Sequence, residues 1–204
     1  MRKLILLFYK SIWMLCFLAR AFITTQVFRL KLWLNNVTFG KNVTSAGSVA
    51  RLLVSKSAAY VKIGNNVAFN NYDGPSWNSK CCLQIKDGGR LCIGDNTGFN
   101  GAYIYCSTSV SVGNWVKIGG GSMIIDSDFH PLDFNNRRHG FDGMKRSPVI
   151  IEDDVFVGTQ CIICKGVTIG KRSIIAAGSV VVKDVPEDEV WGGNPAQFIR
   201  KIRK

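Results

Sequence analysis

Two histidines, His130 and His139, are the only imidazoles in the chain, and His130 stands in the segment IIDSDFHPLDF. An imidazole changes charge near neutral pH, so it suits a general base that takes a proton from a hydroxyl group. The sequence contains neither a G-x-S-x-G elbow nor a reactive Cys–His signature, the two patterns that would indicate a covalent nucleophile. His130 is therefore the candidate for proton transfer, although a single histidine is also a common surface residue.

The elements that position His130 are predicted by a strict six-residue period. Neither an α-helix nor simple strand alternation repeats every six residues, whereas a hexapeptide β-helix does. An ordinary β-sandwich with coincidental spacing is disfavoured, because six unbroken hexads rarely arise by chance. The first register holds Ile151, Val157, Ile163, Ile169, Ile175 and Val181, and a second register, offset by four, holds Val155, Cys161, Val167, Ser173, Ser179 and Val185.

The period continues upstream with interruptions, in VKIGNNVAFN, LCIGDNTGFN and VSVGNWVKIGGGSMII. Gly and Asn in these segments suit tight corners, because both tolerate positive φ. Two polar excursions, residues 70–84 and 127–148, leave the pattern, and His130 opens the second. Excursions from a regular solenoid are where binding and catalysis are usually found.

Cysteine usage indicates a reducing compartment. The seven cysteines are odd in number, and the chain shows no secretory signal with a small-residue cleavage site, so reduced thiols in the cytosol are the simplest interpretation. Cys161-Ile-Ile-Cys164 has redox or zinc spacing, but Cys161 occupies the small-residue register and no second CxxC exists. Structural packing is favoured for this pair.

Residues 1–35 differ from the rest of the chain. The first 34 contain six Lys or Arg and no Asp, Glu, Gly or Pro, and the longest uncharged run, Ser11 to Ala19, is short for a membrane span. A helix through this segment gathers most of its basic residues in one arc and leaves the remainder apolar. That pattern predicts an amphipathic helix lying in the plane of an anionic membrane surface. A cap on the end of the solenoid, or a subunit contact, is the alternative.

The net charge of +12 is concentrated at the two ends of the chain, in residues 1–34 and at Arg200, Lys201, Arg203 and Lys204. No nucleic-acid-binding motif accompanies it. Anionic lipid and a phosphorylated cofactor explain the charge better than nucleic acid.

The hexads and the closing run IIAAGSVVVKDVPEDEVWGGNPAQFIRKI resemble the hexapeptide-repeat acyltransferases, most closely the galactoside, maltose and polysaccharide O-acetyltransferases. The resemblance covers residues 36–204. It implies an all-β fold: a left-handed parallel β-helix, with the N-terminal helical segment in front and a short C-terminal helix after the Gly-Asn-Pro-Ala loop. It also implies a homotrimer with active sites between subunits.

The same resemblance assigns roles to individual residues. It makes His130 the general base, and it implies that Asn100 helps to bind acceptor or thioester. Asp126 and Asp128 flank the histidine and could orient it or bind the sugar. For the donor, acetyl-CoA, it implies pantetheine contacts at Thr159 and Ala177 and phosphate contacts near Val182, Lys183 and Arg200.

Other classes on this fold fit less well. A γ-class carbonic anhydrase needs three histidines for zinc, so no metal is expected. A purely structural β-helix needs no long loop around a histidine. The prediction is a cytoplasmic, membrane-peripheral O-acetyltransferase acting on a sugar hydroxyl, with a lipid-linked polysaccharide precursor as candidate acceptor. An N-acetyltransferase of a nucleotide-linked amino sugar is the alternative that the sequence leaves open.

Overall fold

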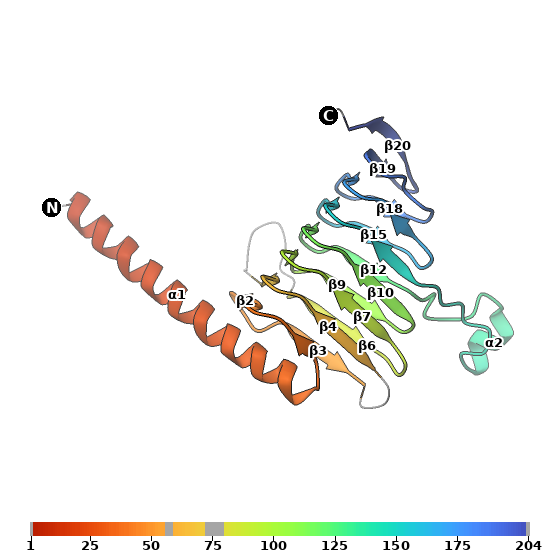
Figure 1. The fold of residues 1–204 in the computed structure, drawn as a ribbon, viewed down its shortest axis with the longest axis horizontal. Coiled ribbons are helices and arrows are strands. Elements are labelled where there is room, and N and C mark those ends of the chain that lie inside the picture. The colour runs from red at the N-terminus through yellow and green to blue at the C-terminus, as the bar shows by residue number, and fades with distance from the viewer. Residues whose placement is uncertain (1, 56–58, 72–79, 203–204) are drawn as a thin grey trace.

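The chain folds into a left-handed parallel β-helix with a long N-terminal helix (Figure 1). The computed structural model describes residues 2–55, 59–71 and 80–202. Three sheets form the walls. The first is β1 (Thr38–Phe39), β4 (Tyr60–Ile63), β7 (Arg90–Ile93), β10 (Ser109–Val112), β13 (Val149–Ile151) and β16 (Thr168–Ile169). The second is β2 (Thr44–Ala46), β5 (Ala68–Asn70), β8 (Gly98–Asn100), β11 (Lys117–Ile118), β14 (Phe156–Val157), β17 (Ile174–Ile175), β19 (Glu189–Gly193) and β20 (Ala196–Lys201). The third is β3 (Arg51–Val54), β6 (Cys82–Ile85), β9 (Tyr103–Cys106), β12 (Met123–Ile125), β15 (Ile162–Ile163) and β18 (Val180–Val181).

The core of the β-helix is built by the two predicted registers, and this prediction is confirmed. Every residue of the first register from Ile151 to Val181 is at most 1% exposed, and every residue of the second from Val155 to Val185 is at most 2% exposed. Equivalent residues stack on successive coils, as Ile118 pairs with Val157 and Val157 pairs with Ile175. The period therefore reports burial directly, because each hexad contributes two inward side chains, one from each register.

A ladder of side chains fixes the first corner, where the chain passes from the first sheet to the second. The backbone N–H of Asn65 donates to Asp95 Oδ1 at 2.7 Å, that of Asp95 to Asn114 Oδ1 at 2.8 Å, and that of Asn114 to Asp153 Oδ1 at 2.7 Å. The bond from Asn65 lowers the pKa of the Asp95 carboxyl. We call these four residues the corner ladder, and they satisfy backbone donors that the turn would otherwise leave unpaired.

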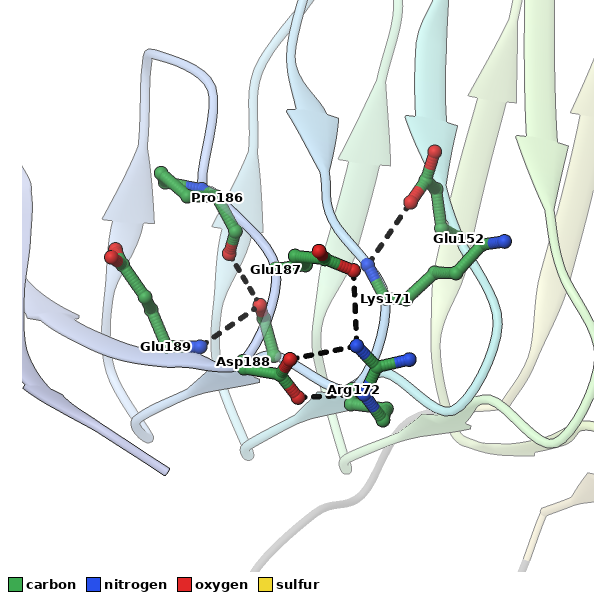
Figure 2. A network of polar contacts seen from close by, with 8 residues as sticks. Glu152, Lys171, Arg172, Pro186, Glu187, Asp188 and Glu189 are labelled. Carbon is green, nitrogen blue, oxygen red and sulfur yellow. Dashed lines mark hydrogen bonds and ion pairs between the residues drawn. The ribbon is translucent and has the colours of Figure 1, made fainter. Parts of the chain in front are cut away.

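The last coil is held at the same corner by an ionic cluster (Figure 2). The Arg172 guanidinium contacts Asp188 at 2.6 Å and Glu187 at 3.0 Å. Its hydrogen bond to Asp188, followed by the charges of both carboxylates, raises the Arg172 pKa. These contacts tie the turn after β16 to the segment that leads into β19.

Helix α1 (Arg2–Leu34) caps the first coil with its C-terminal part. Phe28 and Leu32 are fully buried, and the Phe28 ring meets Phe69 edge-on at 5.2 Å. The hydroxyl of Thr24 donates to the Ser45 carbonyl at 2.6 Å, and Arg29 Nε donates to the Val43 carbonyl at 2.9 Å. The N-terminal half projects away from the coil (Figure 1), and its large apolar side chains from Leu6 to Leu18, apart from half-buried Phe17, are exposed.

The predicted short C-terminal helix is wrong. Residues Ala196–Lys201 form β20, which pairs antiparallel with β19 and closes the second sheet. The pairing aligns Trp191 with Phe198 and Gly193 with Ala196. An antiparallel strand supplies the backbone partners that the last parallel strand would lack at the open edge of the solenoid.

The two predicted excursions lie at different places. Residues 72–79 of the first, and residues 203–204 of the basic C-terminus, fall outside the described part of the structure. The second excursion leaves after β12 and contains the short helix α2 (Phe134–His139), whose N-cap Asp133 accepts the Asn136 N–H at 2.9 Å. The excursion therefore rises from the third corner, where the third sheet passes into the first.

Candidate active site

His130 lines a cavity of about 570 Å³ between the outer face of the third sheet and the excursion. The sheet contributes Gln84 from β6 and two tyrosines, Tyr103 and Tyr105, from β9. Side chains of a parallel strand alternate between core and solvent, so Tyr103 and Tyr105 both point outward from the sheet. The remaining lining residues are Lys86, Phe129, His130, Phe141, Met144 and Arg146.

Aromatic rings shape this pocket. The His130 ring stacks on Phe141 with centroids 5.6 Å apart, and the Tyr105 ring lies 4.5 Å from that of Phe129. The Tyr103 hydroxyl donates to Gln84 Oε1 at 2.7 Å. Burial raises the pKa of both tyrosines, so each keeps its proton and its donor capacity at neutral pH.

Asp128 orders the turn that carries His130. Its carboxylate pairs with Lys165 at 2.7 Å, and its backbone carbonyl accepts the His130 N–H at 2.7 Å. Phe129, between them, adopts a φ of 62°, which is uncommon for a side chain of its size. Asp128 therefore lies in an ion pair that fixes the loop.

The Asp126 side chain is enclosed by backbone and does not line the His130 pocket, so the geometry does not support the predicted contact with the sugar. This side chain is 0% exposed. The carboxylate accepts hydrogen bonds from the backbone N–H groups of Ser107, Thr108 and Ser109 at 2.6–2.9 Å, and from the Ser107 hydroxyl at 2.8 Å. Asp126 thus closes the third corner beneath the excursion.

Asn100, Thr159 and Ala177 lie at the second corner, where the second sheet passes into the third; Thr159 and Ala177 are on successive coils, and Asn100 is two coils before Thr159. Asn100 ends β8, and its Oδ1 accepts the Asn70 side-chain amide at 2.8 Å. The Thr159 carbonyl accepts the Gly178 N–H at 2.8 Å, which places Ala177 one coil above Thr159. Coils are close here: a Cβ on Gly158 would lie 2.6 Å from the Ala177 nitrogen. None of these three residues lines the His130 pocket.

The predicted phosphate contacts gather near the C-terminal hairpin. Lys183 Nζ donates to Gln197 Oε1 at 3.1 Å and lies 5.3 Å from the Trp191 ring centroid. The Trp191 side chain is only 8% exposed, and its indole N–H donates to the Glu189 carboxylate, so the ring is packed into the protein beside Lys183. Val182 and Arg200 are exposed, and Arg200 Nη1 donates to the Lys201 carbonyl.

The single chain therefore separates the predicted residues into three places, of which the C-terminal hairpin, near Val182, Lys183 and Arg200, is one. His130 and Asp128 lie at the third corner, whereas Asn100, Thr159 and Ala177 lie at the second. Sequence reasoning missed Gln84, Tyr103 and Tyr105, although the outward register of YIYC in β9 carried the signal. Within residues 2–55, 59–71 and 80–202, no group of three His, Cys, Asp or Glu side chains could hold a metal ion.

Known proteins resemble the chain as follows. A family model described as the hexapeptide repeat of succinyl-transferase matches residues 148–183. A putative acetyltransferase of Saccharomyces cerevisiae is 34% identical over 156 residues, which cover 76% of this chain and 66% of that protein. A galactoside O-acetyltransferase of Lactococcus lactis is 41% identical over 95 residues, covering 47% of this chain and 44% of that protein.

Among solved structures, a hexapeptide-repeat-containing acetyltransferase from Vibrio cholerae, complexed with acetyl coenzyme A, is 35% identical. That structure has a TM-score of 0.55 and covers 62% of this chain and 70% of its own. The chain spans 44–66% of the length of the first three curated relatives that it matches.

Proposed function

The chain belongs to the hexapeptide-repeat acetyltransferase family, and on that premise we propose that it transfers the acetyl group of acetyl-CoA to a hydroxyl group of a sugar. The observation that carries this proposal is the pocket in which His130 faces Tyr103, Tyr105 and Gln84. Aromatic rings provide apolar surface for a sugar ring, while Gln84 and the tyrosine hydroxyls offer hydrogen bonds to its hydroxyl groups.

In the proposed mechanism His130 acts as general base. The imidazole takes the proton of the acceptor hydroxyl, and the hydroxyl oxygen attacks the thioester carbonyl carbon. The tetrahedral intermediate collapses with loss of the CoA sulfur, which accepts the proton from His130, so no covalent enzyme intermediate forms. His130 is exposed and lines the pocket, so its imidazole is accessible to the acceptor.

The donor is proposed to lie along the second corner. Thr159 and Ala177 present small side chains on successive coils, beside Asn100 two coils earlier in the stack. Lys183 and Arg200, near Val182, are the cations proposed to hold the CoA phosphates. Neutralising either cation is expected to raise the acetyl-CoA KM more than it lowers kcat. An unchanged KM in both Lys183→Gln and Arg200→Gln would move the phosphate site elsewhere.

We propose a homotrimer, the assembly that the family resemblance implies. A second copy is needed on this proposal because the donor corner and His130 flank opposite edges of the third sheet in one chain. Residues such as Thr159 line no part of the His130 pocket. A neighbouring copy that presents its second corner to the His130 excursion would complete the site. Light scattering of the full-length protein tests the trimer.

The N-terminal half of α1 is proposed to hold the enzyme on the inner face of the cytoplasmic membrane, near a lipid-linked precursor of a surface polysaccharide. By length and composition alone, Leu6–Leu34 could also cross a membrane, a test that core helices and signal sequences pass as well. Burial of Phe28 and Leu32 against the first coil favours a helix that lies in the interface.

Binding to vesicles tests this anchor. Full-length protein is expected to sediment with vesicles containing anionic phospholipid and to be partly released by salt, since each basic residue near the surface contributes about 1 kcal/mol. Replacing exposed Trp13 and Leu15 by Ser should reduce binding, whereas Leu132→Ser, 74% exposed on the excursion, is the matched control. Equal binding by both variants would rule out α1 as the anchor.

The catalytic proposal is tested by comparing His130→Ala with His139→Ala, an exposed histidine on α2. Loss of a general base should reduce kcat by about 10²–10⁴-fold in the first variant only. Retained acetyl transfer by purified His130→Ala would refute the mechanism. Mild hydroxylamine treatment of the product separates the O-acetyl ester expected here from the N-acetyl amide of the alternative.

A further inference from the structure

The charged side chains that line the His130 pocket are all positive. Its lining contains two cations, Lys86 and Arg146, and no carboxylate. The cations come from different elements, since Lys86 follows β6 and Arg146 lies near the end of the excursion. Both side chains are exposed, so they can reach a bound molecule.

Five carboxylates, those of Asp87, Asp126, Asp128, Asp133 and Asp142, lie within three residues of the lining in sequence, and none of them lines the pocket. Asp133 caps α2, and Asp142 is an exposed residue of the excursion. Asp126 is buried among backbone N–H groups, and Asp128 pairs with Lys165. Asp87, next to Lys86, accepts a hydrogen bond from the Ser55 hydroxyl. Within the described part of the chain, no ion pair neutralises Lys86 or Arg146.

The field of Arg146 reaches into the pocket. Burial raises the Tyr105 pKa, the charge of Arg146 opposes this rise, and the charge of buried Asp126 adds to it by a smaller amount. Arg146 is held at this place by a backbone bridge to Ser127, which runs antiparallel at the base of the excursion. Position and charge together give the pocket a fixed positive side.

We infer that the acceptor sugar carries an anionic group, a carboxylate or a phosphate, that is bound by Lys86 and Arg146 beside His130. This inference rests on the proposed function and assigns its acceptor class. A guanidinium and an ammonium on one side form charge-assisted hydrogen bonds with such a group. The tyrosine rings then contact the sugar ring, and the acceptor hydroxyl faces the imidazole.

Matched pairs of acceptors test the inference on the full-length enzyme with acetyl-CoA. Methyl glucoside is compared with methyl glucuronide, methyl galactoside with methyl galacturonide, and glucose with glucose 1-phosphate. One charge-assisted contact corresponds to about a tenfold or larger preference in kcat/KM for the anionic member. The uronide and phosphate arms distinguish a carboxylate from a phosphate as the group that is bound.

Variants locate the preference. Arg146→Gln and Lys86→Gln should each remove most of it, mainly through the KM of the anionic acceptor. Lys145→Gln removes the same charge one residue away, from a side chain that does not line the pocket, and should retain the preference. Equal kcat/KM for charged and neutral acceptors in the unaltered enzyme, or equal preference in Arg146→Gln and Lys145→Gln, would overturn the inference.

A binding measurement separates this inference from the proposed function. Saturation-transfer NMR without acetyl-CoA should detect the uronides or glucose 1-phosphate more strongly than their neutral partners, and Arg146→Gln should abolish the difference. If this binding occurs but no sugar is acetylated, the anion site stands and the proposed activity fails. If no anionic sugar binds better than its neutral partner, the anion site is refuted whatever the activity.

Discussion

Replacing Asp126 by Asn should weaken the fold more than any other single carboxylate-to-amide change near the candidate site. The buried Asp126 carboxylate accepts from the N–H groups of Ser107, Thr108 and Ser109 and from the Ser107 hydroxyl. The Asp126 carbonyl also accepts the Ser147 N–H at 3.0 Å, where the excursion returns to the coil. One residue therefore joins two coils and the end of the excursion.

The expected magnitude follows from counting donors. An amide oxygen has two lone pairs, so the asparagine side chain would satisfy at most two of the four donors that the Asp126 carboxylate now satisfies. Each buried donor left without an acceptor costs about 1–3 kcal/mol, which gives a loss of roughly 2–6 kcal/mol. Asp128→Asn removes one partly exposed ion pair and should cost about 0–1 kcal/mol.

Denaturant unfolding followed by circular dichroism measures both variants. Protein concentration must be matched, because association changes the apparent stability of an oligomer. Asp128→Asn is the control for loss of a carboxylate two residues away. An Asp126→Asn protein within about 1 kcal/mol of the unaltered protein would contradict the assignment of Asp126 as the structural centre of this corner.

Three further predictions follow from burial and packing. Iodoacetamide near pH 8 should label exposed Cys16 and spare Cys106, whose pKa burial raises to about 12; equal labelling in a peptide mass spectrum would contradict this. The folded protein keeps the Cys106 thiol protonated, whereas the unfolded chain can ionise it above pH 9.0. The contribution of this thiol to the free energy of unfolding is therefore complete below pH 9.0 and is lost as the pH rises towards 12. Gly158→Ala should lower the melting temperature strongly, because its Cβ would lie 2.6 Å from backbone of the next coil, whereas Gly140→Ala meets open space and should not. Phe28→Ala should cost about 3–5 kcal/mol in denaturant unfolding and release α1 to protease, and unchanged protease resistance would show that α1 does not depend on this ring.

The coil was predictable because its period and its burial have the same physical cause. Aliphatic residues such as Ile163, Ile169 and Ile175 follow one another every six positions, and each is buried in the core behind one of the three sheets. The excursion was equally visible, since residues 127–148 break that period. Local sequence therefore specified the frame and the place where His130 leaves it.

The remaining features depend on contacts that the period does not encode. Residues Ala196–Lys201 form a strand because β19 offers an unpaired edge, which a resemblance to a closing motif does not reveal. The position of Asp126 beside His130 predicts a role in orienting the histidine or binding the sugar, but three backbone N–H groups from another coil enclose its carboxylate. For α1, the structure shows the cap that was one of the two predicted alternatives, because Phe28 is buried against the first coil; exposed Trp13 leaves membrane binding as a proposal.

The corner ladder holds successive coils at the same spacing whatever the length of chain that separates two of its residues. Its successive partners are 30, 19 and 39 residues apart in sequence, yet the bonds that join them are all 2.7–2.8 Å long. The 39-residue interval contains the whole excursion with His130, yet the hydrogen bond from Asn114 N–H to Asp153 Oδ1 is as short as the bond from Asn65 to Asp95. The part of the excursion that follows His130 can therefore be lengthened, shortened or exchanged while the stacked coils keep their register. For protein engineering, this segment is a loop that can be exchanged without altering the β-helix that carries it.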